Sequence, residues 1–333
     1  MFYIGIKNKN GKSMDSLNDS YEPHIDIVKS IIMFCFKQIA TSIQRIKIGI
    51  SNEVYVVALK EKEVIVRMNL EKKYLMGSHD HIPKLKRLGI HVPAILAEDY
   101  EKAQFPFAYQ IQSKIEGQDL GDVIHTLTES QLIVLATEIA SIFQKIQTIP
   151  ANHQFGLVWG GGDNDLSDSW TQRMKIWIDE SIMRGKKTGI MDNDLINLAN
   201  KLYEENKAYF DSVTPITYFG DMCSKNVMIQ NGVLKGLVDL DGLTQGDPLE
   251  AIGRIKLSWY GTTYGKLYTD TVMNALHIDN DARRQVTVYA LINQMSWMCE
   301  NGIQFNLNTN TTVDKMKEAK DKALIKALMT ELS

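Results

Sequence analysis

The sequence predicts an α+β protein with a strand-rich N-terminal part and a mainly helical C-terminal part. Between residues 46 and 117, short apolar runs alternate with charged or glycine-containing turns, which is typical of an antiparallel sheet. From Thr128 onward, apolar residues recur at helical spacing, except in a strand-like segment over residues 215–239. We therefore expect two lobes, one built on a sheet and one built on helices.

Composition limits the possible partners. The chain has 333 residues, of which 44% are hydrophobic, so it is long enough to bury the cores of two lobes. A net charge of -3 gives no electrostatic reason to bind nucleic acid or an anionic membrane. No apolar run reaches transmembrane length, and the three cysteines form no CxxC pair. We expect a cytoplasmic protein with neither nucleic acid nor membrane as partner; the oligomeric state stays open.

The N-terminal part begins with residues 1–22, which lack the apolar core and cleavage pattern of a signal peptide. Apolar spacing then predicts a helix over residues 25–43. Strands are expected after it, around the places where the apolar runs lie: 46–59, 64–68, 92–96 and 107–117. Phe107, Tyr109 and Ile111 are predicted to belong to the core of this sheet.

Helices dominate the remainder. Thr128 and Gln131 form a capping-box pattern, so a helix should begin there and end before Pro150. Residues 155–170 contain three consecutive glycines and several polar residues, which predicts a loop. Further helices are expected over these ranges: 170–182, 195–210, 249–259, 268–276, 279–297 and 313–332.

The segment over residues 216–248 carries the clearest chemical pattern. An apolar run ends at Asp221, and Asn226 follows after four intervening residues. The dipeptide Asn231-Gly232 is a strong hairpin signal between two further apolar runs, the second of which ends at Asp239. The segment therefore predicts a strand, a polar loop and a hairpin that together present three polar side chains.

These three side chains suit phosphoryl transfer, which depends mainly on positioning and charge neutralisation. Asp221 would accept the proton of the attacking hydroxyl, and Asn226 and Asp239 would hold Mg²⁺. An Asp-x4-Asn pattern alone is more often a set of ordinary turn residues. The apolar strands around it and the second Asp favour the catalytic interpretation.

The same segment resembles the aminoglycoside phosphotransferase and choline-kinase-like family. The matching residues are Gly220-Asp221, Asn226, Asp239 and the triplet Gly246-Asp247-Pro248. The family usually has His at the position of Phe219, so this position departs from the pattern. The resemblance implies a two-lobed, protein-kinase-like fold, with lobes at residues 23–114 for nucleotide binding and 115–333 for catalysis and acceptor binding. Residues 1–22 would be a flexible extension.

The resemblance also implies nucleotide contacts in the N-terminal lobe. Gly49-Ile50-Ser51-Asn52 matches a shortened nucleotide loop, in which Ser51, Asn52 and the backbone amides would contact phosphate; a plain hairpin loop is the alternative. Arg67 stands where kinases carry the strand-three Lys that binds phosphate. The segment Gln112, Ser113 and Lys114 would link the lobes and read the adenine edge through its backbone. Glu71 and Asp80 are alternative acidic partners of Arg67.

We therefore expect a kinase that uses ATP or GTP with Mg²⁺ to phosphorylate a hydroxyl of a small molecule. The acceptor is expected to be cationic, from aminoglycoside-like antibiotics to amino alcohols, because acidic residues of the C-terminal lobe would attract it. The residues considered for this role are Asp241, Asp247, Glu250 and Glu300. A pseudokinase that only binds nucleotide is the alternative, motivated by Phe219 and by Arg67 in place of Lys.

Overall fold

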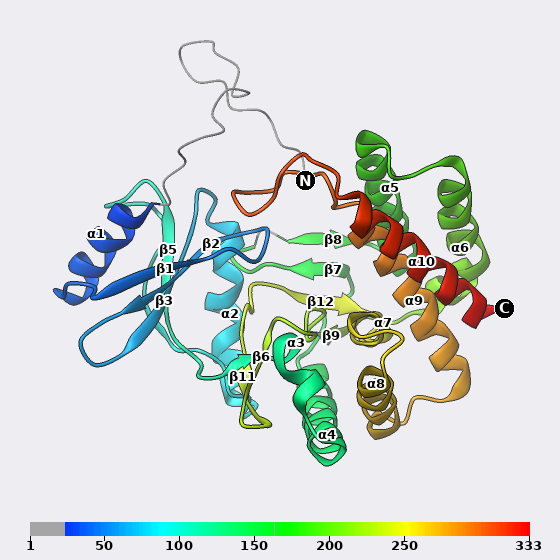
Figure 1. Ribbon diagram of the computed structural model, residues 1–333, viewed down its shortest axis with the longest axis horizontal. Helices are drawn as coiled ribbons and strands as arrows, with labels where there is room; N and C mark the ends of the chain where they lie inside the picture. Colours follow the sequence, from blue (N-terminus) through cyan, green and yellow to red (C-terminus); the bar gives the residue numbers. More distant parts are fainter. Residues whose placement is uncertain (1–23, 163) are drawn as a thin grey trace, which may run out of the picture.

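The N-terminal lobe is a five-stranded antiparallel sheet covered by one helix. The computed structural model describes residues 24–162 and 164–333, so the predicted extension over residues 1–22 lies outside the described part. The strand order is β1-β2-β3-β5-β4, and α1 packs on one face (Figure 1). The elements of this lobe are α1 (Ile25–Phe36), β1 (Ser42–Ile46), β2 (Glu53–Ala58), β3 (Glu63–Asn69), α2 (Lys73–Arg87), β4 (Ile95–Asp99) and β5 (Ala108–Ser113).

The first helix is shorter than the apolar spacing predicts. It ends at Phe36, because Lys37 adopts a left-handed φ of 56°. Residues 42–46 form the edge strand β1 instead, which pairs with β2 in a register that places Ile43 opposite Val57. The apolar spacing over residues 37–43 was misleading because pairing with β2 determines the structure of this segment more strongly than the local sequence pattern does. Phe107, Tyr109 and Ile111 lie in the core of this lobe, as predicted.

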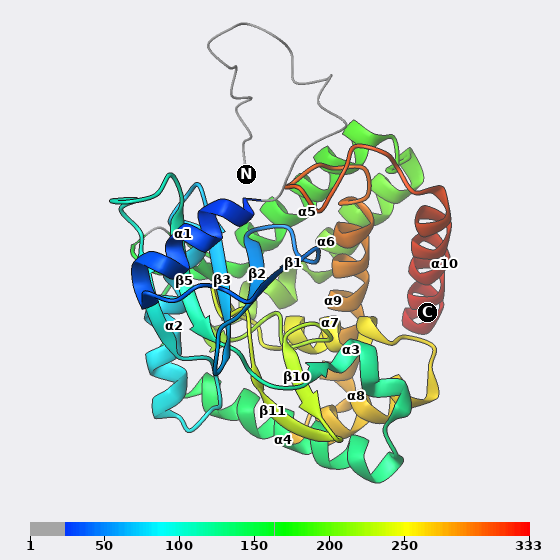
Figure 2. The same cartoon turned by 60° about the vertical axis from the view of Figure 1, so that its left-hand side comes forward.

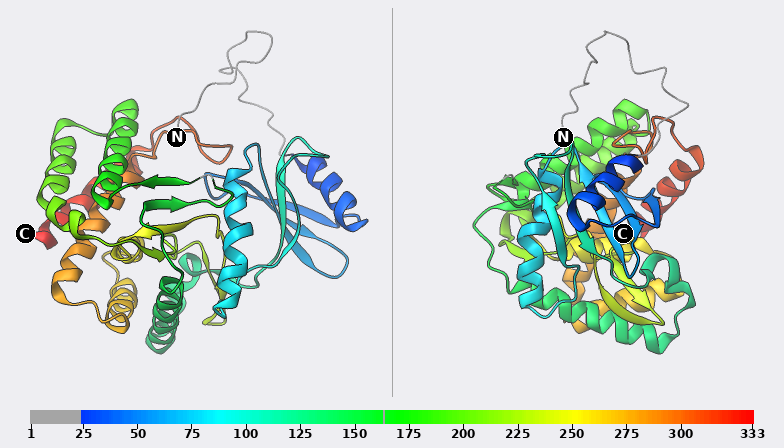
Figure 3. Two further views of the ribbon diagram at one scale, coloured as in Figure 1. Left: turned by 180° about the vertical axis from the view of Figure 1, so that it is seen from behind. Right: turned by 90° about the vertical axis from the view of Figure 1, so that its left-hand side faces the viewer.

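The C-terminal lobe combines two small sheets with seven helices of at least ten residues among its described residues. The sheets have the orders β11-β10-β6 and β8-β7-β12-β9. Figures 2 and 3 show α9 in the interior of the lobe with α10 on its outer side. The elements are β6 (Gln118–Asp119), α3 (Leu120–Val123), η2 (Ile124–Thr126), α4 (Glu129–Gln147), β7 (Phe155–Val158), β8 (Asp165–Ser167), α5 (Trp170–Thr188), α6 (Asn193–Ser212), β9 (Ile216–Tyr218), β10 (Val227–Gln230), β11 (Val233–Leu237), β12 (Leu243–Gly246), α7 (Leu249–Ser258), α8 (Thr263–Ala275), α9 (Asn280–Met298) and α10 (Lys315–Leu332).

Local sequence signals fix several boundaries of this lobe. The capping box at the start of α4 is confirmed, since Thr128 accepts from the backbone of Gln131 and the Gln131 side chain accepts in return. The expected loop over residues 155–170 is wrong, because it contains β7 and β8. β7 pairs with β12, a strand that the sequence pattern also missed. These strands were missed because three or four residues are too few to show an alternating pattern. No described helix is long and apolar enough to cross a bilayer.

Helix α2 lies between the two lobes and approaches the chain after β11 very closely (Figure 3). The closest point is Gly77: a Cβ built there would lie 1.5 Å from the backbone oxygen of Asp241 and 2.5 Å from that of Trp159. Both neighbours are backbone atoms, which cannot rotate away as a side chain can. Only glycine therefore allows α2 to pack against the C-terminal lobe at this distance.

We expect Gly77→Ala to push α2 away from the C-terminal lobe and to lower the free energy of unfolding by at least about 2 kcal/mol, because the added methyl group overlaps backbone atoms. Urea denaturation measures this change. Lys84→Ala, at an exposed position of the same helix, is the control and should stay within about 0.5 kcal/mol of wild type. Equal unfolding midpoints for Gly77→Ala and wild type would show that α2 can move away from the C-terminal lobe without loss of folding free energy.

Candidate active site

The loop after β9 holds an exposed carboxylate in a defined orientation. Asp221 lies in this loop, and the Nδ2 group of the buried Asn226 donates to its backbone oxygen at 3.0 Å and to its Oδ2 at 2.9 Å. The backbone oxygen of Asn226 in turn accepts from Val238 N–H at 3.0 Å. Asn226 thus connects the Asp221 carboxylate to the hairpin that leads to Asp239.

The hairpin places Asp239 in an uncommon backbone conformation. Asn231 and Gly232 have φ values of 54° and 76°, as a two-residue hairpin turn requires, so this predicted turn is confirmed. Two residues after β11, Asp239 has a φ of 58°. A non-glycine residue in this left-handed region costs on the order of 1 kcal/mol or more and is concentrated at functional sites. Its side chain is 53% exposed and faces the cleft between the lobes.

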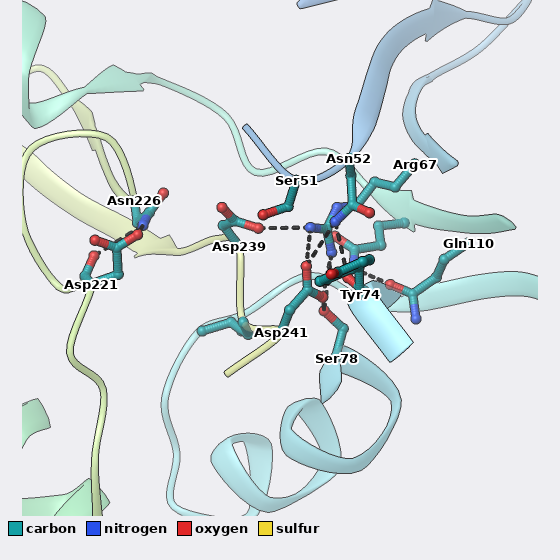
Figure 4. Close-up of polar contacts among 12 residues, drawn as sticks. Ser51, Asn52, Arg67, Tyr74, Ser78, Gln110, Asp221, Asn226, Asp239 and Asp241 are labelled. Carbon is teal, nitrogen blue, oxygen red and sulfur yellow. Dashed lines mark hydrogen bonds and ion pairs between the residues drawn. The ribbon is translucent and has the colours of Figure 1, made fainter. Parts of the chain in front are cut away.

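Arg67 is buried at the centre of a polar cluster that joins the lobes (Figure 4). Its Nη2 donates to Asp239 Oδ1 at 2.6 Å and also to Asp241 Oδ2. Its Nη1 donates to Asp241 Oδ1 at 2.8 Å and to Ser78 Oγ on α2 at 3.1 Å. The two carboxylates raise the pKa of the guanidinium against the opposing effect of burial, so Arg67 is a fixed positive charge.

The structure resolves the question of the acidic partner of Arg67. Neither alternative from the sequence contacts it: Glu71 pairs with Lys73 at 3.2 Å, and Asp80 accepts from Gly161 N–H at 2.9 Å. The partner is Asp241, which the sequence pattern had suggested only as a site for a cation. Asp241 is 174 residues from Arg67 in the chain, so no local spacing could have indicated the pair.

The predicted nucleotide loop lies beside this cluster, and its two named residues differ in their surroundings. The buried Asn52 uses its Nδ2 for Tyr74 O and Asp241 Oδ2, both at 3.0 Å. Ser51 is exposed on the cleft side of the loop (Figure 4). Phosphate contacts from this loop stay a prediction, for which the Ser51 hydroxyl and the backbone amides are available while the Asn52 side chain holds the loop in place.

A segment from the C-terminal lobe reaches over the same loop. It lies between α9 and α10 and extends toward the β1–β2 connection (Figure 1). Asn308 Nδ2 donates to Gly49 O at 2.9 Å, Asn306 Nδ2 donates to the same oxygen at 3.3 Å, and Arg45 Nη2 donates to Asn308 Oδ1 at 2.8 Å. The nucleotide loop is therefore held from both lobes.

The predicted link between the lobes starts within β5, whose last two residues are Gln112 and Ser113, and only Lys114 lies beyond the strand. The Gln112 side chain is buried and donates to Gln110 Oε1 at 2.5 Å. Ser113 N–H donates to Ala94 O at 2.8 Å, and Lys114 Nζ pairs with Glu63 at 2.5 Å. Recognition of the adenine edge by this backbone stays a prediction; the Ser113 amide is already used within the sheet.

The Asp239 and Asn226 oxygens suit a magnesium ion. Mg²⁺ in nucleotide enzymes is usually held by one or two carboxylates together with phosphate oxygens, so a dense cluster of protein ligands is not required. Partial desolvation and the neighbouring charges of Asp241 and Asp221 raise the pKa of the Asp239 carboxyl to about 6, while Arg67 acts in the opposite direction. A bound cation would offset the repulsion between these carboxylates.

Next to Asp221 lies Arg254 of α7, which sequence reasoning missed. Its Nη1 is 3.6 Å from Asp221 Oδ1, and its Nε donates to the buried Glu250 at 2.6 Å. Cys223 is also adjacent to Asp221, and burial raises the pKa of its thiol to about 12, which disfavours the thiolate form at neutral pH.

Asp247 joins three helices of the C-terminal lobe. It accepts from Tyr209 and Tyr289 hydroxyls at 2.6 and 2.8 Å and from Leu249 N–H at 3.0 Å. The buried Glu250 accepts from Tyr218 and Asn293, both at 3.1 Å. Neither carboxylate is therefore open to a cationic acceptor.

Comparison with known proteins agrees with this geometry. The family model described as "Phosphotransferase enzyme family" matches residues 42–286. The chain belongs to this phosphotransferase family. No protein with a curated description matches it.

Three solved structures with a similar fold are distant in sequence from this phosphotransferase. A thermostable mutant of aminoglycoside phosphotransferase APH(4)-Ia, in a complex with AMP-PNP and hygromycin B, has 14% identity and a TM-score of 0.68, over 91% of this chain and 98% of that one. The GDP and kanamycin complex of APH(2″)-IIia has 16% identity and a TM-score of 0.69, over 91% and 98%. A protein described as a putative fructosamine-3-kinase from Haemophilus somnus 129PT has 14% identity and a TM-score of 0.61, over 91% and 96%. These likenesses show the kinase-like two-lobed fold.

The raised pKa of Asp239 makes its charge unfavourable for the folded state at neutral pH. A folded-state pKa above the unfolded value means that stability falls as pH rises from about 4 to about 6. We expect Asp239→Asn to melt about 2 °C higher than wild type at pH 7.5, a modest gain because the side chain is half exposed. Below pH 4 the difference should vanish, since wild type is then protonated in both states.

Calorimetry in the absence of nucleotide and magnesium tests this dependence. Asp179→Asn, which removes an exposed carboxylate paired with Lys175, is the matched control and should change melting little at either pH. A lower melting temperature for Asp239→Asn at pH 7.5 would mean that the ion pair with Arg67 outweighs the repulsion.

Proposed function

We propose that this protein is a small-molecule kinase that transfers the γ-phosphate of ATP or GTP to a hydroxyl of an amine-bearing acceptor. The observation that carries the proposal is the arrangement in Figure 4: Asp239 lies between the Asp221–Asn226 pair and the Arg67 cluster. A base, a metal-binding carboxylate and a buried cation thus border one cleft. The proposal places the protein in the cytoplasm.

In the proposed reaction, Asp221 accepts the proton as the acceptor oxygen forms a bond to the γ-phosphorus. The bond from that phosphorus to the bridging oxygen breaks, and the nucleoside diphosphate leaves with the electron pair. Asn226 keeps the Asp221 carboxylate oriented through its 2.9 Å hydrogen bond. Magnesium, held by Asp239 and Asn226, would neutralise phosphate charge.

Arg67 has a positioning part in this proposal. Its fixed charge, held by Asp241, keeps one oxygen of Asp239 engaged, so the other oxygen is presented to the cleft. The loop with Ser51 and Asn52 would contact the phosphates of the nucleotide. The segment at Gln112, Ser113 and Lys114 would contact its adenine or guanine ring. An incoming nucleotide would therefore meet both lobes, which favours closure of the cleft around it.

The expected acceptor class rests on the resemblance and on related folds. APH(4)-Ia was captured with hygromycin B, and APH(2″)-IIia with kanamycin. These complexes support an acceptor with amine and hydroxyl groups, from aminoglycoside-like antibiotics to amino alcohols. A role in antibiotic resistance or in metabolism is compatible with this class.

A second candidate is a pseudokinase that binds nucleotide without turnover. It is favoured by the full engagement of Arg67 and by Phe219, which is buried in the core at the position where the family has His. The intact set Asp221, Asn226 and Asp239 favours the enzyme.

Asp221→Asn separates these functions. We expect kcat for magnesium-dependent phosphoryl transfer to fall about 100- to 10,000-fold, because the amide cannot accept the proton. Nucleotide affinity should stay within about twofold, since size and polarity are kept. Release of ADP or GDP with a panel of hydroxyl compounds provides the assay, with Asp211→Asn, an exposed carboxylate of α6, as the control. Full activity in Asp221→Asn would remove the base assignment, and no turnover by wild type would favour the pseudokinase.

A further inference from the structure

A cavity of about 210 Å³ opens beside the catalytic loop. Its walls come mainly from α5, α7 and α9, together with β7, β9 and β12, which meet at this side of the C-terminal lobe (Figure 1). Arg254 lines the cavity and also approaches Asp221 Oδ1 at 3.6 Å. Arg254 thus connects the cavity with the proposed base Asp221, which makes this cavity the candidate acceptor site.

The cavity is lined by as many arginines as glutamates. A site that binds only cationic molecules would have no use for the arginines. Three of its lining residues are arginines, and three are glutamates. Glu250 is fully used by Arg254, Tyr218 and Asn293, so it offers no free charge to a ligand. Arg254 is engaged by the same pair, and Arg173 pairs with Asp165 at 2.8 Å, so Arg184, 3.9 Å from Glu180, is the lining arginine with the weakest carboxylate pairing among the described residues.

Arg184 is held in place but has unused hydrogen-bonding capacity. Its Nη2 donates to Ser181 and Ser296 hydroxyls at 3.2 and 3.1 Å. The distance from its Nη1 to Glu180 is 3.9 Å, at the limit of an ion pair, and its buried Nε has no hydrogen-bond partner among the described residues. A positioned guanidinium with free donors is well suited to bind a carboxylate or phosphate in a bidentate manner.

Arg254 and Trp177 complete this side of the cavity. The guanidinium of Arg254 lies 5.3 Å from the centroid of the Trp177 ring, and Trp177 Nε1 donates to Ser296 Oγ at 3.0 Å. Ser296 therefore connects Arg184 and Trp177, so the cation and the aromatic wall are held in one arrangement. Such preorganisation lowers the entropic cost of binding an anion.

We propose that the acceptor carries a carboxylate or phosphate group, bound by Arg184 and Arg254 over the face of Trp177, in addition to its amine and its reactive hydroxyl. This inference rests on the proposed function. The closeness of Arg254 to Asp221 requires the anionic group and the hydroxyl to lie on one small molecule, only a few bonds apart. Hydroxy amino acids and phosphorylated amino sugars have this chemistry.

Glu300 provides a place for the amine. It lines the cavity, and no described residue forms an ion pair with it. Burial raises the pKa of its carboxyl, against the opposing charges of Arg184 and Arg254. An ammonium group beside Glu300 would favour its charged form, so the cavity accommodates a zwitterion.

Matched acceptor pairs test the proposal. Homoserine is compared with 3-aminopropan-1-ol, and glucosamine 6-phosphate with glucosamine, by magnesium-dependent ADP or GDP release. We expect kcat/KM to be at least about tenfold higher for the anionic member of one pair, and the pair concerned tells carboxylate from phosphate. Equal or better turnover of both counterparts that lack the anionic group would overturn the inference while leaving the kinase assignment intact.

Variants of Arg184 show whether this residue causes the preference for the anionic acceptor. Arg184→Gln should lower kcat/KM about 10- to 100-fold for the anionic acceptor and less than about twofold for its counterpart, and Arg184→Lys should restore part of the loss. Arg283→Gln, which removes a similarly half-buried arginine near the start of α9 that does not line the cavity, is the control. An equal loss for both members of the pair would mean that Arg184 is only structural.

If no acceptor is turned over, that result counts against the proposed function and not against the anion site. Binding measurements then test the anion site by itself. Calorimetric titration then compares the same pairs with wild type and Arg184→Gln. Binding of an anionic member to wild type, weakened at least about tenfold in Arg184→Gln, supports the anion site. Equal binding to both proteins, or none to either, overturns it.

Discussion

The buried guanidinium of Arg67 is the interaction on which the rest of the site depends. It comes from the N-terminal sheet, whereas its partners Asp239 and Asp241 come from the C-terminal lobe. A buried charge without its partner costs about 3–5 kcal/mol, so the lobes cannot separate without exposing or neutralising this group. Ser78 on α2 adds a third element to the same group. The cluster thus fixes the distance between the two walls of the cleft.

This constraint has a chemical consequence at Asp239. The residue is forced into a left-handed backbone conformation and shares its surroundings with two further carboxylates, which raises the pKa of its carboxyl. Both features lower the stability of the folded protein and both place a carboxylate where a cation would be bound. The site therefore shows the usual conflict between stability and function.

The segment with Asp221, Asn226 and Asp239 could be predicted from the sequence as a strand, a loop and a hairpin because its determinants are local. Asp221, Asn226 and Asp239 lie within one strand-loop-hairpin segment, whose turn is specified by Asn231-Gly232. The partner of Arg67 could not be predicted in this way, since Asp241 is 174 residues distant and local spacing pointed to Glu71 and Asp80 instead. The same holds for the cavity beside Asp221: Arg184 and Arg254 lie on separate helices, and only tertiary packing brings them together.

A double-mutant cycle between Arg67 and Asp241 tests the central claim most directly. The free energy of unfolding is measured for wild type, Arg67→Met, Asp241→Asn and the double variant. Arg67→Met leaves the Asp241 carboxylate buried without its partner, so we predict a loss of about 3–5 kcal/mol. Asp241→Asn should cost less, because Arg67 keeps its ion pair with Asp239, and the double variant should be at least about 2 kcal/mol more stable than the sum of the single losses implies. Additivity within about 0.5 kcal/mol would show that the two residues act independently and that the lobes are joined by something else.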